Sequence, residues 1–183
     1  MSDASTAASA GTKETETTTG PPVPRLLLAD VAEGDSLPEL AIDVTATTVV
    51  LGAIASRDWR PMHHDHAFAT ERNGVQDIFL NTPNQAAWFE RYLTDWAGPH
   101  ARLGTVTFRM RSSVFPGDRM VFTGTVTAVG TDEAGCGWVT VDVALKVGER
   151  TASTATARLA LPNAPADNPW VRRGDAWRPR PDA

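Results

Sequence analysis

The residues best suited to chemistry in this chain lie in one short run, Ser56-Arg57-Asp58-Trp59-Arg60-Pro61-Met62-His63-His64-Asp65. The run places a carboxylate, Asp58, and an imidazole, His63, on either side of Pro61. An acid and a base held this close together can share a bound water and move protons on and off it. Because Pro61 restricts the backbone between them, the run predicts an acid–base pair made of Asp58 and His63.

The succession of His63, His64, Asp65 and His66 also raises the question of a metal site. Adjacent residues point in different directions along a loop or helix, whereas a zinc ligand set needs side chains that converge on one point. We therefore predict no metal here, and we interpret His64 and His66 as surface or helix-capping residues.

Length and composition favour one soluble domain. The chain has 183 residues, a hydrophobic fraction of 42% and a formal net charge of −5. This charge balance argues against nucleic acid as a partner. The sequence has no basic amphipathic helix that would bind a membrane surface. It also has no apolar run of about 20 residues that could cross a bilayer. With one cysteine, Cys136, no internal disulfide can form, so we expect a cytoplasmic protein.

Two tails flank a single domain that we place at residues 25–161. Residues 1–24 are rich in Ser, Thr, Ala and Gly, which predicts a disordered tail without the apolar core of a secretory signal. Residues 162–183 are rich in Pro, Arg and Asp and are predicted to be irregular. We expect at least one of Trp170 and Trp177 to pack on the domain or on a partner.

The elements that must position the acid–base run can be predicted on both sides of it. Before it, a short alternating strand ends at Val44, and Thr45 is predicted to cap a helix with an apolar face. After it, His64 or Asp65 is expected to open a short helix that ends at Asn73-Gly74.

A longer helix is predicted to begin at Thr82. The run Thr82-Pro83-Asn84-Gln85 is typical of a capping box with proline at the first helical position. Aromatic and apolar residues then recur at helical spacing, and Gly98-Pro99 ends the helix. The stripe comprises Trp88, Phe89, Tyr92, Leu93 and Trp96.

Four alternating runs in the second half predict the sheet that this helix needs. The inward-facing sets are Val106-Phe108-Met110, Met120-Phe122-Gly124-Val126, Val139-Val141-Val143-Leu145-Val147 and Ala155-Ala157-Leu159-Leu161. Such period-two runs are typical of strands with one buried face. The order of elements predicts an α+β fold in which an antiparallel sheet wraps around the 82–96 helix.

This arrangement resembles a known family. The pattern Asp58-x-x-Pro61-x-His63 before the long helix, with Pro116-Gly117-Asp118 after the next strand, is similar to the MaoC-like hydratases and dehydratases of the hotdog fold. The likeness runs from about Gly34 to Leu161. A more specific likeness is to the small subunit of actinobacterial enoyl-CoA hydratases that act on steroid side chains. It is carried by Arg57-Asp58, His63-His64-Asp65, Asp77-Ile78-Phe79, Asn81 and Tyr92-Leu93-Thr94-Asp95-Trp96-Ala97-Gly98.

The resemblance implies a reaction in which water is added to, or removed from, a 2-enoyl-CoA thioester. Asp58 and His63 would hold the water, and a backbone amide at Asn81 or Thr82 would stabilise the thioester oxygen. The family usually has Asn where this chain has Arg60, and a His-Gly pair before the long helix, where the corresponding stretch here is Leu80-Asn81-Thr82. No metal or redox cofactor is implied.

The resemblance also implies a partner, because hotdog domains work in pairs with the site at the subunit seam. The pair would be a homodimer or a heteromer with a second, larger hotdog subunit that makes room for a bulky acyl group. Two other interpretations stay open. One is an acyl-CoA thioesterase that uses Glu90 or Asp95 on the long helix, and the other is an acyl-binding subunit without activity.

Overall fold

The computed structural model describes residues 26–180 of the chain. The tail predicted for residues 1–24 lies outside this range. The helices are α1 (Ala46–Ala55) and α2 (Thr82–Ala97), and the strands are β1 (Ser36–Asp43), β2 (Arg102–Met110), β3 (Arg119–Thr131), β4 (Gly137–Val147) and β5 (Arg150–Leu161). Across residues 26–180, no helix combines the length and apolar character that crossing a bilayer requires.

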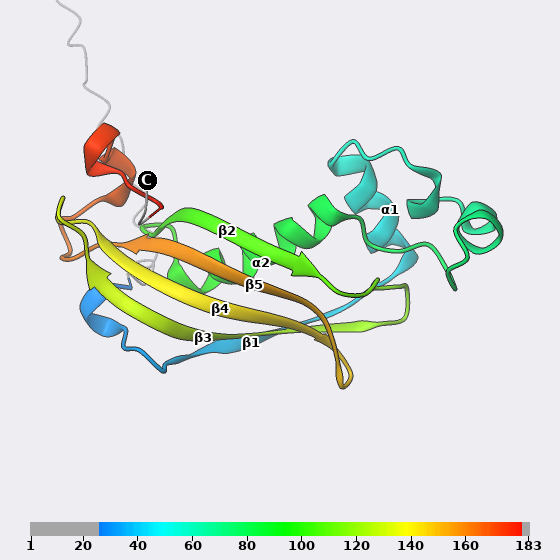
Figure 1. Ribbon diagram of the computed structural model, residues 1–183, viewed down its shortest axis with the longest axis horizontal. Helices are drawn as coiled ribbons and strands as arrows, with labels where there is room; N and C mark the ends of the chain where they lie inside the picture. The colour runs from blue at the N-terminus through cyan, green and yellow to red at the C-terminus, as the bar shows by residue number, and fades with distance from the viewer. Residues whose placement is uncertain (1–25, 181–183) are drawn as a thin grey trace, which may run out of the picture.

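The five strands form one antiparallel sheet in the order β1-β3-β4-β5-β2. The sheet curves along α2, and α1 with the loops after it lies at one end of the molecule (Figure 1). The predicted α+β fold, an antiparallel sheet around a long helix, is therefore confirmed.

Aromatic contacts hold α2 against the sheet. The Phe89 ring meets the Phe122 ring edge-on, with centroids 5.3 Å apart, and Tyr92 stacks on Phe122 at 5.8 Å. Phe108 of β2 lies 5.7 Å from Phe89. Phe89, Tyr92 and Phe122 are almost fully buried, and each such ring removes roughly 150–250 Å² from water. The predicted stripe is therefore core, which fixes the position of the α2 N-terminus.

The two helix starts differ in how well the sequence predicted them. Thr45 is the N-cap of α1, as predicted, and its hydroxyl accepts from the Thr48 amide. For α2 the predicted capping box at Thr82 is wrong, because the N-cap is Asn81, whose side chain accepts from the Asn84 amide. Gln85 does not turn back to the cap. It is buried and its Oε1 accepts from Ser153 Oγ at 2.7 Å.

The segment between the acid–base run and α2 also departs in part from prediction. Asp65 Oδ1 accepts from the Phe68 amide at 3.0 Å, as expected of a residue that opens a helix. The turns that follow, Phe68–Arg72, have π rather than α geometry and end at Asn73. Gly74, with φ of 69°, takes the left-handed conformation that follows many helix ends.

The C-terminal segment packs on the end of the sheet opposite α1 (Figure 1). Trp177 lies 4.9 Å from the Trp138 ring, and Trp170 Nε1 donates to the Ala101 carbonyl at 3.0 Å. The Arg102 guanidinium lies 3.6 Å from the Trp177 ring centroid and donates to the Arg172 carbonyl. Both tryptophans therefore contact the domain, although the segment forms only short 3₁₀ turns.

Close approach of α1 to α2 depends on Gly52, and Gly52→Ala tests this. A Cβ there would lie 1.8 Å from Asn84 Nδ2 and 2.3 Å from Asn84 Cγ, so Asn84 must move and lose its bond to the Thr48 carbonyl. Alanine gains about 1 kcal/mol of helix propensity, but overpacking costs about 1–3 kcal/mol. We expect a net loss of stability in denaturant unfolding. Gly130→Ala, where a Cβ meets nothing within 4 Å, is the control, and an unchanged unfolding midpoint for Gly52→Ala would contradict the prediction.

Candidate active site

Asp58 is positioned by the way the chain leaves α1. Arg57 adopts a left-handed conformation, with φ of 55°, and is the one non-glycine residue of the described part of the chain with positive φ. This conformation turns the backbone so that the Asp58 amide donates to the Ala53 carbonyl at 2.9 Å. The Asp58 carboxylate is thereby fixed beside the C-terminus of α1.

His63 is positioned by the 3₁₀ turn Pro61–His63 and by a contact from outside the run. Its Nδ1 lies 2.8 Å from the Phe79 carbonyl oxygen, and its ring meets the Phe79 ring edge-on at 4.9 Å. A carbonyl can only accept, so Nδ1 carries the hydrogen and Nε2 of the neutral ring presents a lone pair. The residue is 3% exposed, so the ring cannot turn freely.

The two predicted residues face one another. His63 Nε2 lies 3.5 Å from Asp58 Oδ2, and the Asp58 side chain remains 16% exposed. The pKa of Asp58 is lowered, chiefly by the hydrogen bond from Asn81, against a smaller opposing effect of burial. The Arg60 amide and the Arg60 charge lower this pKa further, as does His63 when its ring is protonated. The structure therefore presents an ionised carboxylate beside an imidazole nitrogen, with access to solvent.

Asn81 enters this arrangement through its side chain. Asn81 Nδ2 donates to Ser56 Oγ at 2.8 Å and to Asp58 Oδ2 at 3.0 Å. The sequence had indicated only its backbone amide as a candidate. Asparagine before Thr-Pro is itself a strong helix-capping signal, and this signal could have indicated the cap, though not the contact with Asp58.

The first turn of α2 offers an amide to a ligand. Pro83 has no N–H, the Asn84 amide is taken by Asn81 Oδ1, and the Gln85 amide donates to the Asn81 carbonyl. Within residues 26–180 the amides of Asn81 and Thr82 have no hydrogen-bond acceptor. Asn81 is buried whereas Thr82 is exposed, so Thr82 is the better placed of the two predicted donors.

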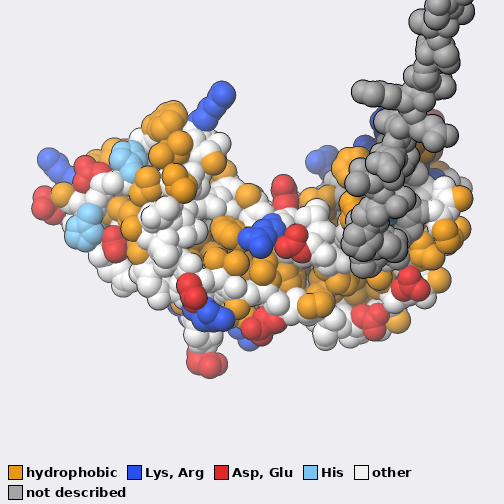
Figure 2. Space-filling model, turned by 180° about the vertical axis from the view of Figure 1, so that it is seen from behind, with side chains coloured by type: hydrophobic (Ala, Val, Ile, Leu, Met, Phe, Trp, Pro, Cys, Tyr) orange, Lys and Arg blue, Asp and Glu red, His pale blue; other side chains and the backbone are white. Residues whose placement is uncertain are grey.

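Two hollows meet at Asp58 and Trp59. One, of about 630 Å³, is lined by Ser56, Arg57, Asp58, Trp59, Arg60, Pro61 and Pro83. The other, of about 300 Å³, is lined by Val50, Ala53, Ile54, Asp58, Trp59 and His64. The first carries two arginines, and the second is mostly apolar. Figure 2 shows apolar and histidine side chains gathered at this end of the molecule.

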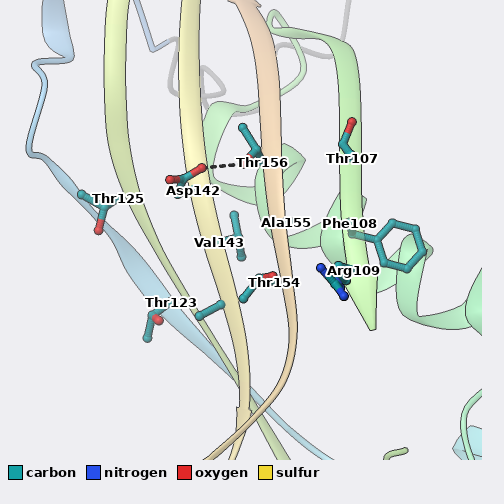
Figure 3. A pocket seen from close by; sticks show the side chains of 11 residues that line it. Thr107, Phe108, Arg109, Thr123, Thr125, Asp142, Val143, Thr154, Ala155 and Thr156 are labelled. Carbon is teal, nitrogen blue, oxygen red and sulfur yellow. Dashed lines mark hydrogen bonds between the residues drawn. The ribbon is translucent and has the colours of Figure 1, made fainter. Parts of the chain in front are cut away.

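A further hollow, of about 560 Å³, lies on the outer face of the sheet, away from the acid–base pair. Its lining comes from β2, β3, β4 and β5 and is rich in threonine (Figure 3). Its one carboxylate, Asp142, accepts from Thr156 Oγ1 at 2.6 Å. This lining has no base beside the acid, so the hollow is not the place for the predicted chemistry.

The other candidate residues lie apart from the pair. His66 is 67% exposed and its Nε2 is 3.9 Å from Asp77 Oδ1. No group of three or more His, Cys, Asp or Glu within residues 26–180 is arranged to hold a metal ion. Glu90 is exposed on α2, and Asp95 pairs with Arg91 at 3.2 Å. Both acids of α2 are exposed to solvent, whereas a carboxylate that activates water needs a site shielded from bulk solvent.

Comparison with known proteins identifies a family whose model matches most of the chain. The family model described as "MaoC like domain" matches residues 30–148. The chain is 37% identical, over 131 residues, to the 3-oxo-4,17-pregnadiene-20-carboxyl-CoA hydratase beta subunit of Mycobacterium tuberculosis (strain ATCC 25618 / H37Rv). That alignment covers 70% of this chain and 95% of the relative.

Solved structures show the same fold. The ChsH1–ChsH2 complex from Mycobacterium tuberculosis contains a chain that matches with a TM-score of 0.66 and 34% identity, covering 71% of this chain and 98% of that one. The (R)-hydratase from A. caviae involved in PHA biosynthesis matches with a TM-score of 0.64 and 24% identity, covering 72% and 98%.

Proposed function

Because the chain belongs to the MaoC-like domain family, we propose that it is a hydro-lyase that adds water across the double bond of a 2-enoyl-CoA thioester. One observation carries this proposal: Asp58 lines both hollows, and its Oδ2 lies 3.5 Å from Nε2 of the buried His63. The reverse reaction, dehydration of a 3-hydroxyacyl-CoA, uses the same groups.

A water between Asp58 and His63 would donate one hydrogen to the carboxylate and one to Nε2. Its oxygen then bonds to the β-carbon as an O–H bond breaks, and the α-carbon receives a proton from the pair. Nδ1 stays bonded to the Phe79 carbonyl throughout, so the imidazole exchanges protons only at the nitrogen that faces the water. The atoms balance without any cofactor: water is consumed and its two hydrogens end on the new hydroxyl and the α-carbon.

Negative charge that develops on the thioester oxygen needs a donor, and we assign that role to the Thr82 amide. This amide lies at the N-terminus of α2, where the aligned peptide dipoles favour an anion. Pro83, the next residue, lines the same hollow as Asp58. A backbone donor of this kind is worth roughly 3 kcal/mol of transition-state stabilisation.

The substrate's acyl group would be bulky and apolar. The relative that is 37% identical is named as a hydratase of a pregnadiene carboxyl-CoA, and in this chain a mostly apolar hollow reaches Asp58. Since the β-carbon must lie next to the water, the acyl group beyond it can extend into this hollow. The hollow with Arg57 and Arg60 is left for the thioester arm.

Trp59→Ala tests this division of the site. Trp59 lines both hollows and is 65% exposed, so an apolar acyl group would cover it. Losing that contact should lower kcat/KM for a steroidal enoyl-CoA about 10- to 100-fold more than for crotonyl-CoA. Trp170→Ala, at the far end of the fold, is the control and should leave the ratio of the two kcat/KM values unchanged. An unchanged ratio in Trp59→Ala would place the acyl group elsewhere.

We also propose a heteromer with a second hotdog subunit. The relative is named as a beta subunit, and the similar structure is a complex of two proteins. In this chain β1 and β2 are the sheet edges, and an unpaired edge strand can accept another chain. Purification with and without a candidate MaoC-like partner, followed by mass measurement, tests this proposal.

The reaction itself is tested by following a 2-enoyl-CoA in two ways at once. Hydration removes the absorbance of the conjugated enoyl thioester without releasing thiol. A thioesterase would instead release free CoA, and a subunit without activity would do neither. Release of thiol, or no reaction with either a short or a steroidal substrate in the presence of the partner, would contradict the proposed function.

A further inference from the structure

Asn81 uses both ends of its side-chain amide. It is 1% exposed, its Oδ1 accepts from the Asn84 amide, and its Nδ2 donates to both Ser56 Oγ and Asp58 Oδ2. A side-chain amide nitrogen carries two hydrogens, so both are engaged. This one side chain therefore ties the start of α2 to the end of α1 and to the acid–base run.

The oxygen of Asp58 that Asn81 contacts is the one that faces His63. Asp58 Oδ2 lies 3.0 Å from Asn81 Nδ2 and 3.5 Å from His63 Nε2. Among residues 26–180, the polar contacts of the other oxygen, Oδ1, are with the Arg60 amide at 3.4 Å and the Arg60 side chain at 3.8 Å. Asn81 thus makes the shortest contact to the carboxylate and fixes its rotation.

Asn81 is itself anchored on the α1 side. Ser56 Oγ, which accepts from Asn81 Nδ2, donates to the Gly52 carbonyl at 2.7 Å. The path from α1 through Ser56 and Asn81 to Asp58 consists of side chains that are buried or partly buried. A shift of either helix would therefore change the position of the Asp58 carboxylate.

Helix capping alone does not account for an asparagine here. Asp and Ser cap helices about as well as Asn, but neither can both accept from the Asn84 amide and present an NH₂ group to a carboxylate. We propose that Asn81 is a positioning residue that aims Asp58 Oδ2 at His63 Nε2, so that one water reaches both. This inference rests on the proposed hydratase function for its effect on rate.

Asn81→Asp separates capping from positioning, because aspartate keeps the cap and the side-chain size but replaces the donor with a second carboxylate. We expect a lower Tm, because a second buried carboxylate repels Asp58, and in the protein that remains folded kcat should fall at least about 100-fold with little change in KM. The Asp58 carboxyl, followed by NMR, should titrate at higher pH, because its main stabilising hydrogen bond is replaced by a repulsive charge.

Two further variants complete the experiment. Asn81→Ser keeps a capping oxygen but is too short to reach Asp58, so kcat should fall without any added charge. Thr45→Asp makes an equivalent change at the N-cap of α1, which does not contact Asp58, and should leave kcat and the Asp58 titration unchanged. Parent-like kcat in both Asn81 variants, or an unchanged Asp58 titration in Asn81→Asp, would reduce Asn81 to a helix cap and overturn the proposal. Should the parent protein hydrate no enoyl-CoA, the proposed function fails, but the NMR titration still tests whether Asn81 governs Asp58.

Discussion

Asp58→Asn is expected to lower kcat for enoyl-CoA hydration by about 10²–10⁴-fold, the usual contribution of a general acid–base group. The substitution keeps the size of the side chain and its capacity to accept from Asn81. It removes the negative charge that takes a proton from the water. KM should change little, because the carboxylate contacts the water rather than the body of the substrate.

The control for this variant is Asp65→Asn, a carboxylate seven residues further along the same stretch of sequence. Asp65 caps the Phe68 amide, and asparagine caps equally well, so activity should persist. Steady-state kinetics on crotonyl-CoA and a steroidal enoyl-CoA, with circular dichroism to verify folding, give the comparison. Asp58→Asn protein that is folded and turns over at the parent rate would refute the assigned role.

His63→Ala is expected to cause a loss of similar size, about 10²–10⁴-fold in kcat, together with reduced stability. The imidazole is buried against Phe79 and bonded to its carbonyl, so its removal leaves both a void and an unpaired acceptor. The unpaired acceptor should lower the free energy of unfolding by about 1–3 kcal/mol. The void should lower it further. A lower Tm should therefore accompany the loss of rate.

His63→Asn separates the two effects of the alanine variant. Its amide can still donate to the Phe79 carbonyl, yet it offers no base in place of Nε2. We expect stability to recover in part while kcat remains low. His66→Ala removes an exposed imidazole of the same segment and serves as the control. Recovery of rate along with stability would show that His63 supports the fold only.

Local sequence predicted the elements and the pair, since their signals are carried by near neighbours. Thr45 caps α1 because its partner Thr48 is one turn away, and the period-two runs place their own apolar faces. Asp58 and His63 were recognised from their spacing around Pro61. The structure confirms that they face each other, and their catalytic role remains a prediction.

Contacts across long stretches of sequence were not predictable in the same way. The bond between His63 and the Phe79 carbonyl, and that between Asn81 and Asp58, depend on how α1, the π turns and α2 pack together. The cap of α2 was placed one residue too late although Asn81 carries a local capping signal. The role of Gln85 was not predictable, because Gln85 bonds to Ser153 of β5 rather than to its own helix start. Tertiary packing overrode a local preference there.

Within residues 26–180, the C-terminal segment packs against the start of the edge strand β2 but not against its end, so the two ends of this strand differ in their contacts. Arg102 is held against Trp177 and bonded to the carbonyls of Pro169 and Arg172, whereas the other end of β2, which ends at Met110, points toward the side of the molecule where α1 lies (Figure 1). An edge strand frays from its ends, where local opening requires least free energy. We therefore expect amide hydrogens near Met110 to exchange with solvent before those near Arg102, so that transient opening of this edge strand is greatest toward the end of the molecule that holds Asp58 and His63.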